Sequence, residues 1–193
     1  MDLEQTPKKQ MRCWLTEEEQ EYIVDYYEED IEKQLALRLM LECGLRSEEV
    51  PRVSQADLEP SSAGYTKLKI PLAKRGFRTG VIPQELATQI RTIKSLKNLH
   101  KTDPVIKKSP RTIQRWVTNA AEDLADDLDD EDWHYVSAHD MRRTWASGLV
   151  QKNVPIPLVM SWGGWENYET FKKHYWRESE ELVAQHLERI GIK

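Results

Sequence analysis

The sequence has only two cysteines and no long apolar run. Cys13 and Cys43 form no CxxC pair, and no Cys/His cluster has the spacing of zinc ligands, which disfavours a structural zinc site and a secreted disulfide scaffold. The longest apolar stretch is far shorter than the roughly 18 residues that span a bilayer, and the first ten residues contain no apolar signal core. We therefore expect neither a membrane protein nor an exported one, and we expect a cytoplasmic location.

Two motifs of nucleotide and metal chemistry are also missing. The sequence contains no Gly-rich loop that could cradle phosphates and no carboxylate motif that could bind a catalytic metal ion. These absences disfavour a metal-dependent phosphoryl-transfer hydrolase. What remains is a chain of 193 residues, 39% hydrophobic, which fits one compact domain of ordinary size.

The net charge of −5 conceals a very uneven distribution of charge. Residues 17–32 contain nine acidic side chains and residues 121–132 contain eight, with no Lys or Arg in either segment. Outside them, 28 Lys and Arg stand against 16 Asp and Glu. Thirteen of these bases lie between Thr66 and Trp116, where Glu85 and Asp103 are the only acids. Such a segment is either a solvated lysine-rich surface or a surface that binds phosphates.

The order of apolar residues and of helix-ending signals predicts a mostly α fold with a small antiparallel sheet. Thr16 followed by Glu19 is a capping box that opens a helix, and Gly44 is a natural stop for the next one. Alternating apolar residues predict strands at 65–72 and 79–82, joined by a basic hairpin. Helices are expected at about 16–27, 30–42, 84–98, 110–128, 137–151, 156–162, 167–175 and 179–189.

Two short segments could bind an anion. His139 and Arg142 are three residues apart, so on a helix they face the same side and can converge on one anion. Arg46 follows the helix-ending Gly44, where backbone amides and a guanidinium can face a phosphate together. Each segment alone has an ordinary alternative, which is a surface salt bridge for the first and a simple helix cap for the second.

Five segments, far apart in the chain, form a more specific pattern. They are Gly44-Leu45-Arg46 followed by Glu49-Val50, the basic hairpin, His139-Asp140-Met141-Arg142-Arg143-Thr144, Gly164-Trp165, and Tyr175. In this order they resemble the catalytic domain of the tyrosine recombinase (phage integrase) family, and the resemblance covers nearly the whole chain. It implies the DNA breaking-rejoining fold and a site-specific recombinase or integrase. Such an enzyme cleaves and rejoins DNA through a 3′-phosphotyrosine, with no metal and no other cofactor.

The resemblance also implies roles for individual residues. Tyr175 would be the nucleophile, with Tyr168 as the competing candidate, and Glu49 would support Arg46. The general acid would be Lys74, although Arg75 and Arg78 lie in the same turn. The implied catalytic residues are Arg46, Lys74, His139, Arg142, Trp165 and Tyr175. The arginines expected to contact DNA are Arg75, Arg78, Arg111, Arg115 and Arg143.

The expected partners are double-stranded DNA and further copies of this chain assembled on it. We divide the chain into an N-terminal extension at 1–15, a catalytic domain at 16–178 and a helix at 179–193 that can be exchanged between protomers. The core-binding domain that usually precedes the catalytic domain in the family is expected to be absent. The alternative to an enzyme is a DNA-binding or regulatory relic of the family that cleaves no strand.

Overall fold

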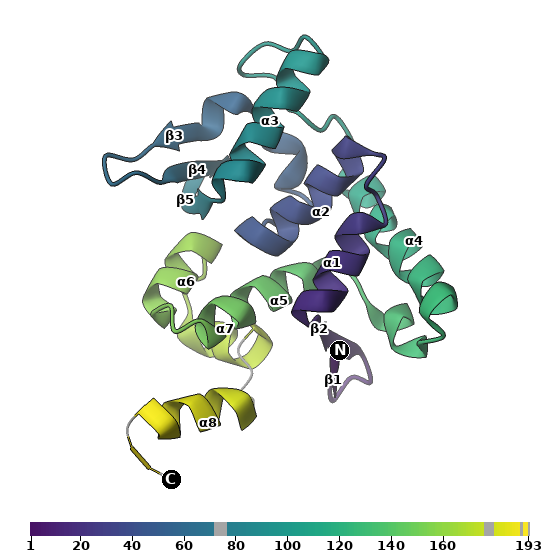
Figure 1. Cartoon of the computed structure of the whole chain (residues 1–193), viewed down its shortest axis with the longest axis vertical. Helices are drawn as coiled ribbons and strands as arrows, with labels where there is room; N and C mark the ends of the chain where they lie inside the picture. The colour runs from purple at the N-terminus through teal and green to yellow at the C-terminus, as the bar shows by residue number, and fades with distance from the viewer. Residues whose placement is uncertain (72–76, 176–179, 190, 193) are drawn as a thin grey trace.

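The computed structural model describes residues 1–71, 77–175, 180–189 and 191–192, and it has the expected mostly α fold with small antiparallel sheets (Figure 1). No helix in this part of the chain is both long and apolar enough to span a membrane. The helices are α1 (Glu17–Asp25), α2 (Ile31–Cys43), α3 (Gln84–Leu96), α4 (Pro110–Leu128), α5 (Ala138–Gln151), α6 (Ile156–Gly163), α7 (Tyr168–Tyr175) and α8 (Glu180–Arg189). Short 3-10 turns lie at η1 (Val50–Arg52), η2 (Gln55–Asp57) and η3 (Glu131–Tyr135).

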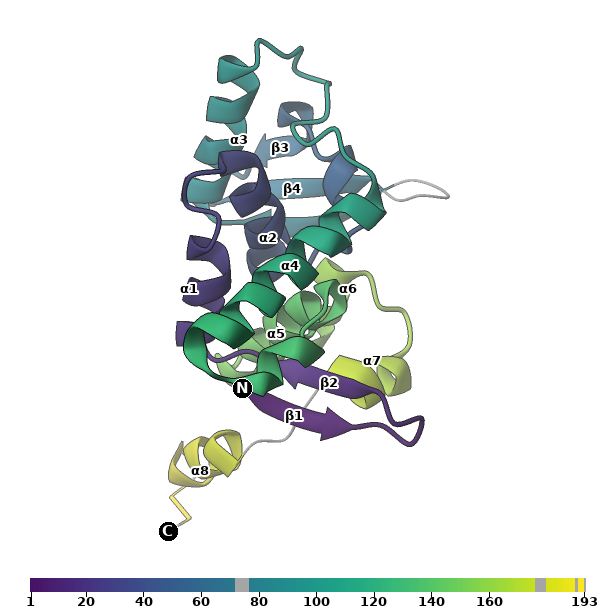
Figure 2. The ribbon, with the colours of Figure 1, turned by 90° about the vertical axis from the view of Figure 1, so that its right-hand side faces the viewer.

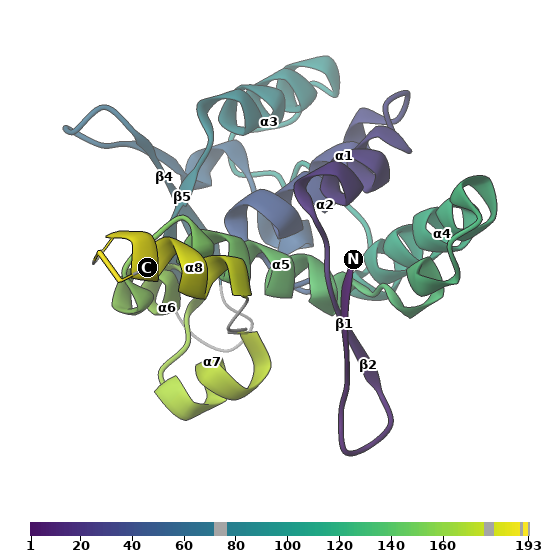
Figure 3. The same cartoon turned by 60° about the horizontal axis from the view of Figure 1, so that its bottom comes forward.

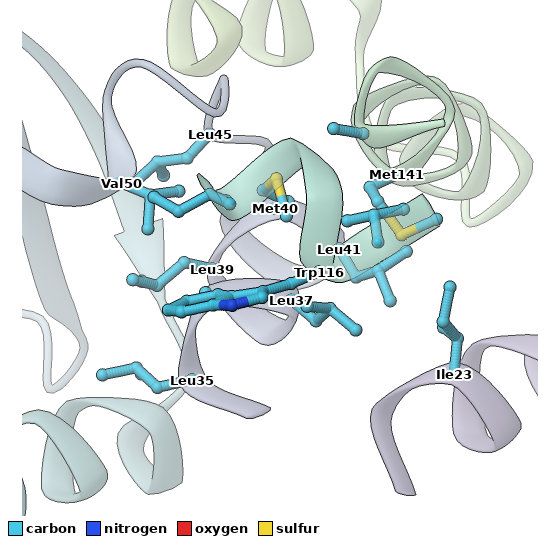
Figure 4. Close-up of a cluster of buried hydrophobic side chains, with 14 of the residues drawn as sticks. Ile23, Leu35, Leu37, Leu39, Met40, Leu41, Leu45, Val50, Trp116 and Met141 are labelled. Carbon is cyan, nitrogen blue, oxygen red and sulfur yellow. The ribbon is translucent and has the colours of Figure 1, made fainter. Parts of the chain in front are cut away.

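Helix α2 is the central element, because it packs against α1, α3, α4 and α5. Its apolar residues have mixed spacings along the sequence, and accordingly seven of its thirteen residues are buried on nearly all sides. Figure 4 shows the cluster around it, in which side chains of α2 meet Ile23 of α1, Trp116 of α4 and Met141 of α5. This core fixes the ends of α2 and α5, where the candidate site residues lie.

The capping signals in the sequence set the helix ends correctly. Thr16 accepts a hydrogen bond from the backbone of Glu19, and the Glu19 side chain accepts one from the backbone of Thr16, which completes the predicted capping box. Gly44 has a φ of 62° and ends α2 in the left-handed conformation.

The main sheet has three antiparallel strands, β3 (Leu58–Pro60), β4 (Thr66–Pro71) and β5 (Phe77–Ile82), in the order β3-β4-β5. Leu68 of β4 pairs with Gly80 of β5, and Pro71 pairs with Phe77 at the end of the hairpin. The two longer strands were predicted, whereas β3 was not. The predicted basic hairpin covers residues 73–78. Residues 73–76 lie outside the described residues, whereas Phe77 and Arg78 belong to β5.

Residues 2–14, which the sequence patterns left without assigned structure, form a second sheet. Strand β1 (Asp2–Gln5) pairs antiparallel with β2 (Met11–Trp14), and Leu3 lies opposite Cys13. Strand β2 packs against α5, and Cys13 is fully buried in the main core. Figure 2 shows this hairpin beside α5 and close to α7. Part of the segment predicted as an extension is therefore built into the domain.

A second, smaller core holds the C-terminal helices together. It is formed by Trp145 and Val150 of α5, Val159 of α6, Phe171 of α7, and their neighbours. Figure 3 shows α5 running across the molecule, with α6 and α7 on one side and the hairpin β1-β2 at its beginning. Two residues of the sequence motif, Trp165 and Tyr175, belong to this cluster, which fixes their positions.

Candidate active site

Arg46 begins the site at the turn that follows α2. The left-handed Gly44 turns the chain back on itself, and a Cβ atom there would lie 2.2 Å from the ring of Trp145. The Glu49 carboxylate accepts a 2.8 Å hydrogen bond from the Arg46 backbone and a 3.0 Å one from its Nη1. Glu49 therefore contacts Arg46 through both its backbone and its side chain, and its supporting role in the site stays a prediction. About a third of the Arg46 side chain remains exposed.

Glu49 also holds Arg78, a residue of β5. Its side chain is buried, and Arg78 Nη2 donates to its carboxylate at 2.9 Å. Arg78 is 7% exposed and also donates to the carbonyl oxygens of Gly44 and Trp162. Burial disfavours the ionised form of Glu49, but the hydrogen bonds and charges of the arginines outweigh it and lower the pKa of Glu49. Glu49 is therefore a buried carboxylate that fixes arginines from two elements.

Arg142 of α5 lies at the centre of the site. It is 1% exposed, and it donates to the carbonyl oxygen of Gly44 and, at 2.5 Å, to that of Gly163. Its Nε has no hydrogen-bond partner among the described residues. An arginine has five N–H groups, so Arg142 keeps donors for an anion after binding both carbonyl oxygens. Burial and the nearby Arg46 and Arg78 lower the pKa of Arg142 to about 9.

Trp165 packs directly against Arg142. Helix α6 ends at the left-handed Gly164, and the next backbone N–H, that of Trp165, donates to the Met160 carbonyl at 2.9 Å. The Arg142 guanidinium carbon lies 4.1 Å from the centre of the Trp165 ring system. The indole Nε1 of Trp165 is buried and has no hydrogen-bond partner in the described part of the chain. Two neighbouring buried donors without acceptors are the pattern expected where an anion binds.

Tyr175, the last residue of α7, lies at hydrogen-bonding distance from His139. Its hydroxyl is 2.9 Å from Nε2 of His139, the second residue of α5, and its ring packs 4.4 Å from that of Trp165. Tyr168 begins the same helix at its other end and is 43% exposed. Of the two tyrosines that the sequence offered, Tyr175 is the one beside the arginines.

The charges around His139 hold it in the neutral form. Partial burial, followed by the positive charges of Arg143, Arg142 and Arg46, lowers the pKa of His139 to about 4. At neutral pH its imidazole therefore has an unprotonated nitrogen, which can accept the proton of the Tyr175 hydroxyl.

A pocket of about 220 Å³ opens beside Arg142 and His139. It is lined by Arg46, Arg142 and His139, by the Ser47-Glu48 turn, and by Gln114 of α4. Gln114 donates to the hydroxyl of Ser47 at 3.0 Å, which ties the N-terminal part of α4 to the turn after α2. The pocket has the size and charge to hold a phosphate group between the two arginines.

The structure places the remaining predicted residues in three different settings. Lys74 and Arg75 lie outside the described residues. Arg111 and Arg115 are exposed on α4, in the same part of the helix as Gln114, which lines the pocket. Both remain predicted DNA contacts.

Arg78 and Arg143 need correction, because both are buried. Arg78 is held by Glu49 and by two carbonyl oxygens, as described above. Arg143 donates to the carboxylate of Asp140 and to the carbonyl oxygen of His174. Their guanidinium groups bind acceptors inside the protein. This position does not fit the predicted contact with DNA at the surface. Nothing in their sequence neighbourhood distinguishes them from exposed arginines.

The described residues contain no group of three or more His, Cys, Asp or Glu side chains placed to bind a metal ion. The metal-independent chemistry expected from the sequence stays a prediction.

Three solved structures define the class of this fold. The XerA recombinase superposes with a TM-score of 0.74 at 14% identity, over 92% of this chain and 65% of that one. The XerH site-specific recombinase bound to difH substrate gives a TM-score of 0.68 at 15% identity, over 94% and 55%. The catalytic domain of bacteriophage HP1 integrase gives a TM-score of 0.61 at 16% identity, over 94% and 99%. The chain therefore has the fold of tyrosine recombinase catalytic domains.

Sequence comparison identifies the family. The phage integrase family model matches residues 13–181, and the chain belongs to this family. The integrase of Salmonella phage P22 is 27% identical over 181 residues, which cover 87% of this chain. The chain corresponds to only 44% of the length of that relative.

Proposed function

We propose that this chain is the catalytic part of a site-specific DNA recombinase that cleaves and rejoins strands through a 3′-phosphotyrosine. The observation that carries the proposal is the hydrogen bond between Tyr175 and His139 next to the arginine-lined pocket. A nucleophile, a proton acceptor and two cations for one phosphate thus come together from three separate segments, which are the turn after α2, α5 and α7. The DNA complexes of the XerH recombinase and of the Tn1549 integrase support DNA as the partner.

In the proposed reaction the Tyr175 oxygen attacks the phosphorus of a DNA phosphodiester. A bond forms between that oxygen and phosphorus, the bond from phosphorus to the 5′ oxygen breaks, and the phenolic proton passes to Nε2 of His139. Arg46 and the unpaired donors of Arg142 and Trp165 stabilise the negative charge that grows on the nonbridging oxygens. Because Glu49 and two carbonyl oxygens already hold the guanidinium groups of Arg46 and Arg142, these groups need little reorganisation as the charge develops.

The 5′ oxygen leaves readily only if it receives a proton. Lys74 is our candidate for this donor, because an arginine, with a pKa above about 12, gives up a proton poorly. Of the alternatives, Arg78 is disfavoured by its burial against Glu49. A substrate with a 5′-thiolate leaving group needs no proton. Such a substrate should restore the cleavage rate of the Lys74→Ala variant and leave the cleavage rate of the Arg75→Ala variant unchanged. Rescue of Arg75→Ala instead would assign the role to Arg75.

A nicked duplex that traps the covalent intermediate tests the proposal. We expect the wild-type chain to form a denaturant-resistant adduct, also in excess EDTA. Tyr175→Phe should form none while binding the duplex normally, because the variant lacks only the hydroxyl group. Tyr168→Phe is the matched control and should retain the adduct.

The same assay tests the alternative, a relic that binds DNA without cleaving it. Specific binding without an adduct from the wild-type chain would favour the relic. An adduct that depends on Tyr168 would show that the nucleophile is misassigned, and a requirement for metal would contradict the mechanism.

We further propose that copies of the chain assemble on DNA through α8. This helix stands apart from the rest of the chain, and its apolar residues Val183 and Leu187 are exposed (Figures 1 and 2). The side chains of Leu182, His186 and Ile190, which complete the predicted apolar stripe, are outside the described part. A groove of about 600 Å³ between β2, α1, α2 and α5 includes the apolar side chains of Leu41 and Leu149 and could receive such a helix.

Removal of residues 179–193 tests this assembly. We expect the shortened chain to bind a single site as before and to lose cooperative binding to paired sites. Unfolding of the shortened chain would show that the helix stabilises its own domain. Cooperative binding that persists would show that the helix does not contribute to assembly.

A further inference from the structure

The N-terminal hairpin reaches the helix that carries Tyr175. Arg12 of β2 donates from Nη1 to the carbonyl oxygen of Lys173 at 2.9 Å, and its Nη2 lies 2.8 Å from Nδ1 of His174. Only 12% of the Arg12 side chain is exposed. Lys173 and His174 immediately precede Tyr175 in the last turn of α7. Arg12 thus binds the turn that holds the proposed nucleophile.

Arg143 binds the same turn from α5. Its Nε donates to the carbonyl oxygen of His174 at 3.0 Å, while its Nη1 donates to Asp140. The last four carbonyl groups of a helix have no partner within it, and the C-terminal end carries a partial negative charge. Arg12 and Arg143 therefore donate hydrogen bonds to carbonyl groups at this end of the helix, and their positive charges offset its partial negative charge. An eight-residue helix is too short to be stable alone, so its geometry depends on such contacts.

The hairpin is itself fixed on α5. The backbone N–H of Cys13 donates to Asp140 at 3.0 Å, and that of Leu15 donates to the Thr144 hydroxyl at 3.0 Å. Helix α5 also carries His139, the partner of Tyr175. Strand β2 therefore joins the two helices whose side chains meet in the Tyr175–His139 hydrogen bond, and Figure 2 shows it close to both.

We propose that Arg12 is a positioning residue for strand cleavage, which sets the place of the Tyr175 hydroxyl by holding the last turn of α7. This inference rests on the proposed function. Arg12 does not line the phosphate pocket, and it lies just before residue 13, where the family match begins. Its effect on cleavage therefore passes through α7 and not through contact with the reacting atoms.

Single-turnover cleavage of the nicked duplex by Arg12→Ala tests the proposal. A misplacement of about 1 Å can slow a reaction about 100-fold, so we expect cleavage to slow by roughly 10- to 100-fold with unchanged affinity for DNA. Arg12→Lys keeps the charge and one donor group, so it should recover part of the rate. Glu4→Gln is the matched control. Glu4 pairs with Arg12 at 3.2 Å on the side facing solvent, and its loss should leave the rate nearly unchanged.

A second measurement does not depend on activity. The rings of His139 and Tyr175 have centroids 5.4 Å apart, so the free wild-type chain should give a nuclear Overhauser effect between their ring protons. We expect this signal to weaken in Arg12→Ala and to persist in Glu4→Gln. Cleavage at the wild-type rate in both Arg12 variants would overturn the proposal. So would slow cleavage with an undiminished signal. If the wild-type chain does not cleave, the proposed function fails, and the signal alone decides whether Arg12 places Tyr175.

Discussion

At the scale of single residues, the buried Glu49 organises the site. It is 1% exposed and accepts hydrogen bonds from both Arg46 and Arg78, and it lies 4.0 Å from Arg142. The carboxylate reduces the repulsion among these three arginines. Removing it would leave buried positive charges without their partner.

We therefore expect Glu49→Ala to lower the free energy of unfolding by about 3–5 kcal/mol, the usual cost of removing one partner of a buried ion pair. Glu48→Ala, at an exposed neighbouring position, should change it by less than about 0.5 kcal/mol. Urea denaturation of the three proteins measures both values. If the two substitutions lowered the free energy of unfolding by the same small amount, Glu49 would not be needed to hold the arginines.

The same residue makes stability depend on pH. Because the pKa of Glu49 is lower in the folded chain than in the unfolded chain, its contribution is complete above the ordinary value of about 4.5 and is lost as the pH falls below it. The wild-type chain should thus lose more stability on acidification than Glu49→Gln does. A parallel decline of the two proteins in urea titrations at pH 6 and pH 3.5 would contradict this account.

His139 provides a direct measure of the electrostatics of the site. Its imidazole should titrate near pH 4 in the free chain, far below the ordinary value of about 6.5, because it is partly desolvated beside three arginines. An NMR titration of the ring protons measures the pKa, with exposed His100 as the internal control. A bound phosphate group should raise the pKa of His139 by balancing the arginines. A pKa near 6.5 for His139 in the free chain would mean that the charges of the three arginines do not affect its imidazole.

The sequence identifies the residues around the phosphate site but not all of their neighbours. Arg46, His139 and Arg142 were expected from the resemblance to the tyrosine recombinase family, and the structure brings them to one pocket. Arg78 and Arg143 were expected on the surface, yet they are buried. An arginine in a basic segment looks the same in sequence whether it faces solvent or a buried carboxylate, since the carboxylate comes from another part of the chain.

At the scale of elements, the turn after α2 is the most constrained piece of backbone. Gly44 combines a φ of 62° with close approach to Trp145, and its carbonyl oxygen accepts from both Arg78 and Arg142. A side chain at this position would have to shift the Trp145 ring and, with it, the turn that carries Arg46.

Gly44→Ala should therefore lower the stability of the protein by more than its backbone strain alone would. Gly64 is the matched control, because its φ is 86° but a Cβ atom there would meet nothing within 4 Å. We expect Gly64→Ala to cost about 1–2 kcal/mol for the left-handed conformation, and Gly44→Ala to cost about 1–3 kcal/mol more for the crowding. Thermal or urea unfolding measures the difference. Similar losses at the two positions would show that Trp145 adapts without cost.

The elements that carry local signals were predicted, and those that depend on distant contacts were not. The capping box at Thr16 and the alternation in β4 are visible in a few consecutive residues. The hairpin formed by β1 and β2 has a polar sequence with little alternation, and it is held by Asp140 and Thr144 of α5, more than a hundred residues away. Its role beside α7 could therefore not be predicted from its own residues.

At the scale of the whole molecule, opposite charges occupy different regions. The acidic helix α1 packs against α4, where Tyr26 donates to Asp123 in the acidic C-terminal half of that helix. Arg111 and Arg115 lie at the other end of α4, near the phosphate pocket. This arrangement separates the basic side chains near the pocket from the acidic region, although the net charge of the chain is negative.

Replacing Arg111 and Arg115 with Ala should weaken DNA binding and reduce its dependence on salt. Each phosphate contact contributes about 0.9 to the slope of log K against log salt concentration, so the double variant should lose up to about 2 units of slope. Fluorescence anisotropy from about 50 to 200 mM salt measures it. Glu17→Gln with Glu18→Gln, on α1, is the control and should leave the slope unchanged. An unchanged slope in the arginine variant would remove this end of α4 from the DNA interface.

The most direct test of the central claim is to identify the bond between protein and DNA in the trapped adduct. Protease digestion of the wild-type adduct followed by mass spectrometry should yield a single modified peptide that contains Tyr175. The phenolic oxygen of that residue should carry a 3′-phosphate, and the strand on the other side of the cut should have a free 5′-hydroxyl. DNA attached to any other residue, or a phosphate on the 5′ end of the released strand, would contradict the account.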